Sequence, residues 1–321
     1  MNPIINPRTR LLRSGWRAAI FFALLISPYM IFGLFLKRGE SIEVVAIDVS
    51  LEMVLFYALL VAWTVVVSWF CLRFLERMRL SSLGFALHSG WFGDVIKGCV
   101  IGALMMAAVV TLQVIGGARM RFNPVWYGEG GIDWTGARGV ATEIVAALVL
   151  LILAGAWEEL IYRGYAFQTL LRGAPAVVPI LLLSVFFGVA HWGNPNRTPF
   201  STVNTALAGV WLSIAYLRTR SLWFPTALHF TWNWVMGAVF GIPVSGLRIP
   251  QHPILVSAIE PVWLAGGSYG SEGGAAATVV LFVAIVVIWR ARWLRVSPET
   301  SAALSERTPN GEDAISLGLR S

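Results

Sequence analysis

Long apolar runs, separated by short polar connections, recur along most of the chain. A helix needs roughly 20 mainly apolar residues to cross a bilayer, and about eight stretches approach that length. They cover residues 15–36, 51–74, 92–115, 140–156, 177–192, 203–217, 222–240 and 275–289. Several are short, and the fourth continues as a more polar helix to Leu171. We therefore expect an all-α transmembrane bundle with about seven to eight spanning helices.

The same pattern divides the chain into four parts. Residues 1–79 hold the first two apolar runs, and residues 80–274 form a core that contains the polar motifs described below. Residues 275–295 hold the last apolar run. Residues 296–321 are polar, with Ser, Thr, Pro, Gly and Glu, and this composition predicts a disordered tail.

Composition supports the membrane interpretation. The chain is 57% hydrophobic and 13% charged, whereas soluble domains carry about 25% charged residues. Its two cysteines, Cys71 and Cys99, lie within or beside apolar runs. Neither a disulfide framework nor a cysteine metal site is therefore expected.

Basic residues gather in every second connection between the apolar runs. These connections contain Arg8, Arg10, Arg13 and Arg17, then Arg73, Arg77 and Arg79, then Arg172, then Arg218 and Arg220, and finally Arg290, Arg292 and Arg295. Cytoplasmic connections are enriched in Lys and Arg, so we expect both termini in the cytoplasm, although Arg119 and Arg248 weaken the contrast. The net charge of +7 comes without a basic stripe interleaved with aromatic residues, so no nucleic-acid partner is expected.

Two adjacent carboxylates and an arginine follow directly on the apolar run 144–156. Ionisable groups at that depth are costly and rare, which makes them functional candidates. Glu159 and Arg163 are four residues apart, so on a helix they share a face and can pair. Glu158 lies about 100° around the same helix and stays free to act as a general base toward water. The alternative is a structural ion-pair network at the membrane edge.

Two later apolar runs each carry one histidine with a helical companion. Phe187 and His191 are four residues apart, and so are His229 and Asn233. An imidazole and an amide on one helix face can donate hydrogen bonds to a developing oxyanion. The alternatives are a structural histidine near the membrane boundary for His191 and a polar clamp between helices for His229 and Asn233.

Taken in order, the three motifs resemble the CPBP family of intramembrane proteases, also called the Abi or CAAX-protease family, which is related to the type II CAAX prenyl endopeptidases. The resemblance covers roughly residues 80–274, and its most specific part is residues 143–240. Residues 80–85 and 162–165 add to the likeness. The motif residues are Glu158, Glu159, Arg163, Phe187, His191, His229 and Asn233.

The resemblance implies a role for each motif residue. Glu158 and His191 are expected to activate the attacking water, while His229 and Asn233 are expected to stabilise the oxyanion. The expected supporting residues are Glu159, Arg163 and Phe187.

The resemblance also leaves two mechanisms open. Glu158, His191 and His229 are candidate ligands for a catalytic zinc ion, which usually has three protein ligands and an open position for water. A glutamate-activated water needs no metal when an oxyanion hole is in place. We favour the mechanism without a cofactor and keep Zn²⁺ as the alternative.

These observations favour a multi-pass intramembrane endopeptidase of a bacterial plasma membrane. Its expected partners are the lipid bilayer and a hydrophobic or membrane-associated peptide, with a prenylated CAAX substrate as one option from the family. A non-proteolytic immunity or scaffolding protein on the same fold is one alternative. A proton-coupled transporter is another, because intramembrane Glu, Arg and His also form proton relays, but the internal repeats typical of transporters are not evident.

Overall fold

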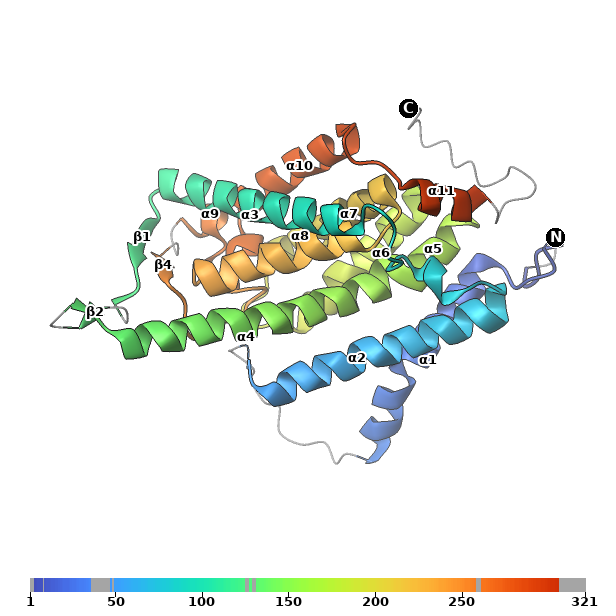
Figure 1. Cartoon of the computed structure of the whole chain (residues 1–321), viewed down its shortest axis with the longest axis horizontal. Coiled ribbons are helices and arrows are strands. Elements are labelled where there is room, and N and C mark those ends of the chain that lie inside the picture. The colour runs from blue at the N-terminus through green and yellow to red at the C-terminus, as the bar shows by residue number, and fades with distance from the viewer. Residues whose placement is uncertain are drawn as a thin grey trace.

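The predicted apolar runs lie in helices in the computed structural model (Figure 1). The structure describes residues 3–7, 9–35, 47, 49–124, 127–128, 131–257 and 261–305. The helices are α1 (Ser14–Phe35), α2 (Leu51–Phe70), α3 (Trp91–Ile115), α4 (Trp134–Glu159), α5 (Tyr165–Leu171), α6 (Val177–Ala190), α7 (Pro199–Thr219), α8 (Trp223–Trp234), α9 (Val262–Ala265), α10 (Ala275–Arg290) and α11 (Pro298–Ser305). The all-α prediction is confirmed, with two small sheets added at one end of the bundle.

Both sheets are two-stranded and antiparallel. Strand β1 (Arg119–Phe122) pairs with β4 (Ile254–Ser257), and β2 (Tyr127–Gly128) forms a hairpin with β3 (Gly131–Ile132). They lie at the left-hand end of the bundle in Figure 1, where α3 ends and α4 begins. We call this the sheet end of the molecule.

Among the described residues, four helical stretches are long and apolar enough to cross a membrane: Leu51–Glu76, Trp91–Ile115, Trp134–Leu171 and Pro199–Thr219. Three apolar helices are shorter: Ser14–Pro28, Val177–Gly193 and Ala275–Arg290. The structure therefore supports a membrane-spanning bundle, while the number of seven to eight spanning helices stays a prediction.

Three of the helices continue through π-helical turns. These turns are Cys71–Glu76 after α2, Leu160–Gly164 between α4 and α5, and Val235–Val239 after α8. The second turn joins α4 and α5 into one stretch of 38 residues, Trp134–Leu171. Single π turns inside helices occur often at functional sites, and the second and third border two of the sequence motifs.

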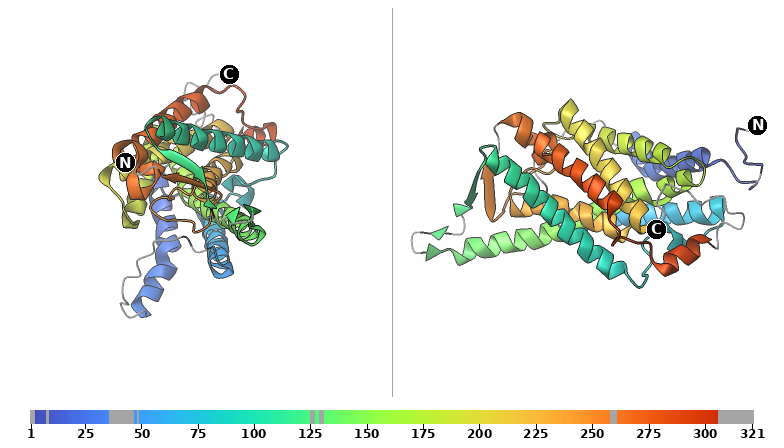
Figure 2. Two further views of the ribbon diagram at one scale, coloured as in Figure 1. Left: turned by 90° about the vertical axis from the view of Figure 1, so that its left-hand side faces the viewer. Right: turned by 90° about the horizontal axis from the view of Figure 1, so that it is seen from above.

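Helix α8 occupies the middle of the bundle and packs against α3, α4 and α7 (Figures 1 and 2). Glycines allow the close approach of α3. A Cβ atom at Gly98 would lie 2.5 Å from Ala227 Cβ, and one at Gly102 would lie 2.8 Å from the Leu228 carbonyl oxygen. Small residues at such crossings are typical of membrane helix interfaces, and here they bring the backbone of α8 deep into the bundle.

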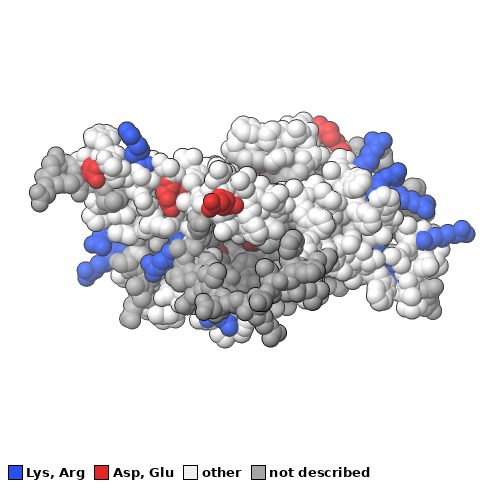
Figure 3. Space-filling view, turned by 90° about the horizontal axis from the view of Figure 1, so that it is seen from below, with Lys and Arg blue, Asp and Glu red and all other residues white. Residues whose placement is uncertain are grey.

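Apolar side chains cover much of the outer surface. Exposed examples on α2, α6 and α10 are Leu55, Leu59, Leu181, Val185, Phe282 and Val283. Figure 3 shows that Lys and Arg side chains gather toward the two ends of the long axis. An apolar belt with charged ends is what a bilayer requires, so the protein is an integral membrane protein.

The structure differs from the sequence expectation at the C-terminal tail. Residues 298–305 form α11 instead of a disordered segment. The Ser297 hydroxyl accepts a hydrogen bond from the Thr300 backbone N–H at 3.1 Å, and Pro298 occupies the first helical position, both of which favour a helix start. Residues 306–321, the rest of the predicted tail, lie outside the described residues.

Candidate active site

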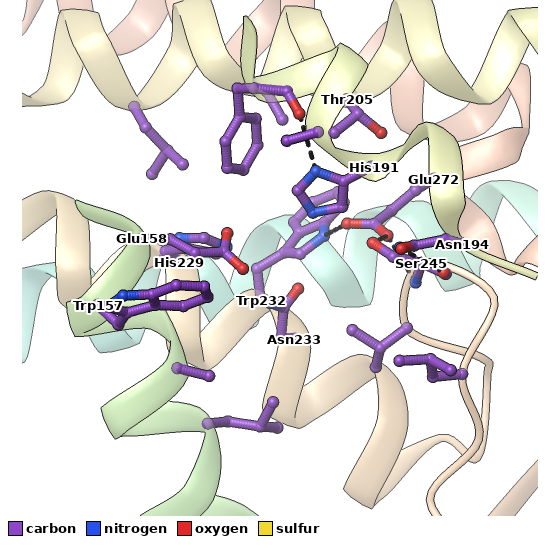
Figure 4. A pocket seen from close by; sticks show the side chains of 18 of the residues that line it. Trp157, Glu158, His191, Asn194, Thr205, His229, Trp232, Asn233, Ser245 and Glu272 are labelled. Carbon is purple, nitrogen blue, oxygen red and sulfur yellow. Dashed lines mark hydrogen bonds and ion pairs between the residues drawn. The ribbon is translucent and has the colours of Figure 1, made fainter. Parts of the chain in front are cut away.

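The residues of all three motifs meet around one cavity of about 350 Å³. Its walls come from α4, α6, α7 and α8, from the first turns of α2, and from connections at the sheet end. Figure 4 shows the polar side chains that project into it. The predicted site residues that line it are Glu158, Phe187, His191, His229 and Asn233.

Glu158 lies at the end of α4, with a side chain that is 23% exposed. Its Oε2 atom is buried and has no hydrogen-bond partner among the described residues. The same atom lies 3.7 Å from Nε2 of His229. A buried polar atom without a partner is costly, and the side chain that carries this one lines the cavity.

Glu159, the next residue along the helix, has the opposite environment. It is fully buried and does not line the cavity. Its Oε1 atom accepts hydrogen bonds from Nη1 of Arg163 at 2.9 Å and from Nδ1 of His229 at 2.9 Å. Nη2 of Arg163 in turn donates to the Gly209 carbonyl oxygen at 2.8 Å. The expected Glu159–Arg163 pair is present, and it also ties α4 to α7 and α8.

The orientation of His229 follows from this bond. Because Nδ1 donates to Glu159, Nε2 points toward Glu158 and the cavity. A carboxylate on Nδ1 is the usual way to fix the tautomer and the ring orientation of a functional histidine. The Glu159–His229 bond was not predicted, because the two residues are 70 positions apart in the sequence.

His191 reaches the same cavity from the end of a short helix. Helix α6 contains only 14 residues, which corresponds to about 21 Å, and its last residue, Ala190, lines the cavity. The His191 side chain donates from Nδ1 to the Phe187 carbonyl oxygen at 2.8 Å, which leaves Nε2 free (Figure 4). His191, the residue that follows the end of α6, thus lies at the same cavity as His229.

Phe187 packs between the two histidines. Its ring centroid lies 4.8 Å from that of His191 and 6.0 Å from that of His229. The guanidinium of Arg163 lies 5.0 Å from the same centroid, a cation–π arrangement that a buried site strengthens. Phe187 therefore holds both imidazole rings in position.

Asn233 lies one turn after His229 on α8 and also lines the cavity. Its side chain makes no hydrogen bond to another described residue. In Figure 4 the carboxamide lies on the same side of the cavity as His229, below the ring of His191. Its N–H₂ group is therefore free to donate to a bound molecule.

Among the polar residues of the cavity that were not predicted are Asn194, Ser245 and Glu272. They lie in connections between helices, where helical spacing gives no information about facing side chains. The sequence showed the connection 266–274 only as a glycine-rich turn region. Glu272 was the one side chain in this connection that indicated a functional group.

The candidate zinc ligands line one cavity, and zinc dependence stays a prediction. Glu158, His191 and His229 share the cavity, but within the described part of the chain no three His, Cys, Asp or Glu side chains are close enough to hold a metal ion.

Comparison with known proteins relates the segment that contains the site to a protein family. Residues 140–235 match the family model described as type II CAAX prenyl endopeptidase Rce1-like. No curated protein and no solved structure matches the chain. The matched segment runs from α4 to the π turn after α8 and includes all of the motif residues. The chain thus contains an Rce1-like domain of the CPBP family at residues 140–235.

Proposed function

We propose that the protein is an intramembrane endopeptidase that cleaves a hydrophobic or membrane-associated peptide with a water activated by Glu158 and His191. One observation carries the proposal. The partner-free Oε2 of Glu158 and the free Nε2 of His191 line the same cavity as two groups that can donate hydrogen bonds, His229 Nε2 and the Asn233 amide.

The reaction begins with a water held by Glu158 and His191. Glu158 removes a proton while the water oxygen attacks the peptide carbonyl carbon, and the carbonyl π electrons move to oxygen. The C–N bond then breaks, and the protonated Glu158 gives its proton to the leaving amine. General base catalysis of this kind contributes roughly 10²- to 10⁴-fold to the rate.

The oxyanion accepts hydrogen bonds from Asn233 and from Nε2 of His229. Because Nδ1 of His229 already donates to Glu159, donation from Nε2 requires the doubly protonated ring. The carboxylates of Glu158 and Glu159 lie on either side of this imidazole and stabilise its positive charge. No metal ion takes part in this mechanism.

The cavity walls suit an apolar peptide. Much of the lining is aliphatic or aromatic, with Leu150, Leu151, Ala208, Trp211 and Leu212 among the residues that form it. Apolar pockets with a few placed polar groups are typical of ligand sites. The Rce1-like domain favours this function over a scaffolding role or proton-coupled transport.

The test is hydrolysis by the purified protein in liposomes. Internally quenched hydrophobic peptides are incubated in H₂¹⁸O, and the products are analysed by mass spectrometry. We expect cleavage, with one ¹⁸O atom in the new carboxylate of the N-terminal product, because water is the nucleophile. Absence of cleavage across a peptide library that varies the residues around the scissile bond would contradict the proposal.

A further inference from the structure

A second carboxylate lies in the cavity, across from the first. In Figure 4, Glu158 and His229 occupy one side, and Glu272 occupies the other with Ser245 and Asn194. Glu272 belongs to the 3₁₀ turn Ser271–Gly273, far from the motif residues in sequence. None of the three sequence motifs includes it.

Neutral groups make all the hydrogen bonds to this carboxylate. Oε1 accepts from Nε1 of Trp232 at 3.2 Å, and Oε2 accepts from the Ser245 backbone N–H at 2.9 Å and from the Ser245 hydroxyl at 2.6 Å. Among the described residues, no Lys, Arg or His side chain forms an ion pair with Glu272. Hydrogen bonds from the protein thus stabilise its negative charge, but no described cationic side chain neutralises it.

The backbone under Glu272 is firmly held. Nδ2 of Asn204, on α7, donates to the Glu272 carbonyl oxygen at 2.9 Å. Nε2 of Gln113, on α3, donates to the Ser271 hydroxyl at 2.9 Å. Gly270 has φ 96°, and a Cβ atom there would lie 1.9 Å from the Pro243 carbonyl oxygen. These contacts fix the backbone that carries the Glu272 carboxylate, although it lies in a connection between helices.

The charges around the cavity do not balance. Arg163 compensates Glu159, and the protonated His229 of the proposed mechanism compensates Glu158, while Glu272 forms no ion pair with a described cationic side chain. The field of Glu272 is also felt by Tyr269, whose pKa is raised to about 12 by burial and then by this carboxylate. A carboxylate at low dielectric without a counterion attracts a cation strongly.

A purely structural role accounts for less of this arrangement. A neutral Gln at position 272 would keep one oxygen that accepts the hydrogen bonds from Ser245. Its N–H₂ group would replace the other oxygen of the carboxylate. Two or three neutral hydrogen bonds alone do not require a charged residue on the wall of an otherwise apolar cavity. The charge itself is the feature that remains without a partner.

We propose that Glu272 is a specificity-determining residue that binds a positively charged group of the substrate, either a Lys or Arg side chain or a free α-amino group, beside the scissile bond. This inference rests on the proposed protease function for its biological meaning. It concerns binding and not the chemical step. Glu272 therefore selects among peptides that Glu158 and His191 then cleave.

The experiment compares peptides that differ in one charge. A hydrophobic quenched peptide receives Lys or the uncharged isostere norleucine at each position around the scissile bond, and each version is made with a free and with an acetylated N-terminus. We expect one position or the free N-terminus to raise kcat/KM by roughly 10- to 100-fold in the native protein, as charge-assisted hydrogen bonds do. The acetylated series identifies which of the two cations binds.

Two variants assign the preference to Glu272. Glu272→Gln should lose it with little change for the norleucine peptide, mainly through KM. Glu299→Gln, a matched change on the exposed α11, should keep it. If Glu272→Gln does not fold, Glu272→Asp retains the charge and should retain part of the preference.

A binding measurement separates this inference from the proposed function. Fluorescence anisotropy of labelled Lys and norleucine peptides is measured with Glu158→Gln protein, in which cleavage is absent. A charge preference without any cleavage by native protein would contradict the protease proposal alone. Equal affinities and equal rates for all Lys, norleucine, free and acetylated peptides would overturn the role of Glu272, even if cleavage is demonstrated.

Discussion

At the residue scale, Glu158 and Glu159 show how adjacent identical side chains take different roles. A helix turns by about 100° per residue, so one carboxylate faces the cavity and the other faces the protein interior. The first has an oxygen without a partner, and the second bonds to both Arg163 and His229. Their substitutions should therefore affect different properties.

Glu158→Gln should abolish cleavage and leave the fold intact. Gln keeps the shape of the side chain but cannot take a proton, so we expect kcat to fall by roughly 10²- to 10⁴-fold. The melting temperature should not change, because Oε2 of Glu158 makes no hydrogen bond to a described residue. Near-normal turnover by the purified variant would remove Glu158 from the mechanism.

Arg163→Ala should instead lower stability. It leaves the fully buried Glu159 carboxylate without its cation and frees the Gly209 carbonyl oxygen. Breaking a buried ion pair in this way costs about 3–5 kcal/mol. Thermal unfolding in detergent measures the loss, with Arg292→Ala, a substitution of an exposed arginine, as the control. Lost activity at unchanged stability would mean that Arg163 contacts the substrate.

Asn233→Ala tests the oxyanion hole and the metal question together. Removal of one donor should lower kcat by roughly 10²- to 10³-fold, while exhaustive chelation of the native protein should leave kcat unchanged. The zinc alternative predicts the reverse order of effects. Stoichiometric zinc in active protein, lost in both His191→Ala and His229→Ala, would establish that alternative.

Sequence spacing predicted contacts within one helix and failed for contacts between segments that are distant in sequence. The Glu159–Arg163 pair followed from a separation of four residues on a helix. The bond from His229 to Glu159, and the place of Glu272 in the cavity, depend on how distant segments pack. A single sequence carries no periodic signal for such tertiary contacts.

At the element scale, helical length matters as much as helical position. The apolar runs located the helices closely, with α3 at Trp91–Ile115 against an expected 92–115. Hydropathy could not show that α6 ends at the cavity, nor that π turns follow Glu159 and Trp234. The first feature brings His191 to the cavity, and the π turns change where the helix faces point beyond Glu159 and Trp234.

The crossing of α3 and α8 should depend on its glycines. Gly98→Ala places a Cβ 2.5 Å from Ala227 Cβ, so the helices must separate, at a cost of about 1–3 kcal/mol for overpacking. Gly93→Ala is the matched control, since nothing lies within 4 Å of its added Cβ on the same helix. Thermal unfolding should show a loss for Gly98→Ala only, and equal melting temperatures would argue against a tight crossing.

At the scale of the whole molecule, the cavity belongs to the sheet end. Its walls include Val244, Ser245, Leu247 and Glu272 from connections at that end, and Met53 and Tyr57 from the start of α2. Among the described residues that line it, none comes from the connections 77–90, 172–176 or 291–297 at the opposite end. The beginning of α1 and helix α11 lie at that opposite end (Figure 1).

This arrangement, with the distribution of arginines, predicts on which side of the membrane the cavity opens. The end that holds α11 carries Arg73, Arg77, Arg79, Arg218, Arg220, Arg290, Arg292 and Arg295. The sheet end carries fewer basic residues, so the positive-inside rule places the α11 end in the cytoplasm and the cavity mouth toward the outer half of the membrane.

Cysteine labelling in intact cells tests this orientation. The exposed Arg121, on β1, and the exposed Arg292, after α10, are each replaced by Cys. A membrane-impermeant maleimide should label Arg121→Cys in intact cells, and Arg292→Cys only after permeabilisation. The native protein, with Cys71 buried and Cys99 half-buried, gives the background. The reverse pattern would place the cavity on the cytoplasmic side, where substrates would have to arrive from the cytosol.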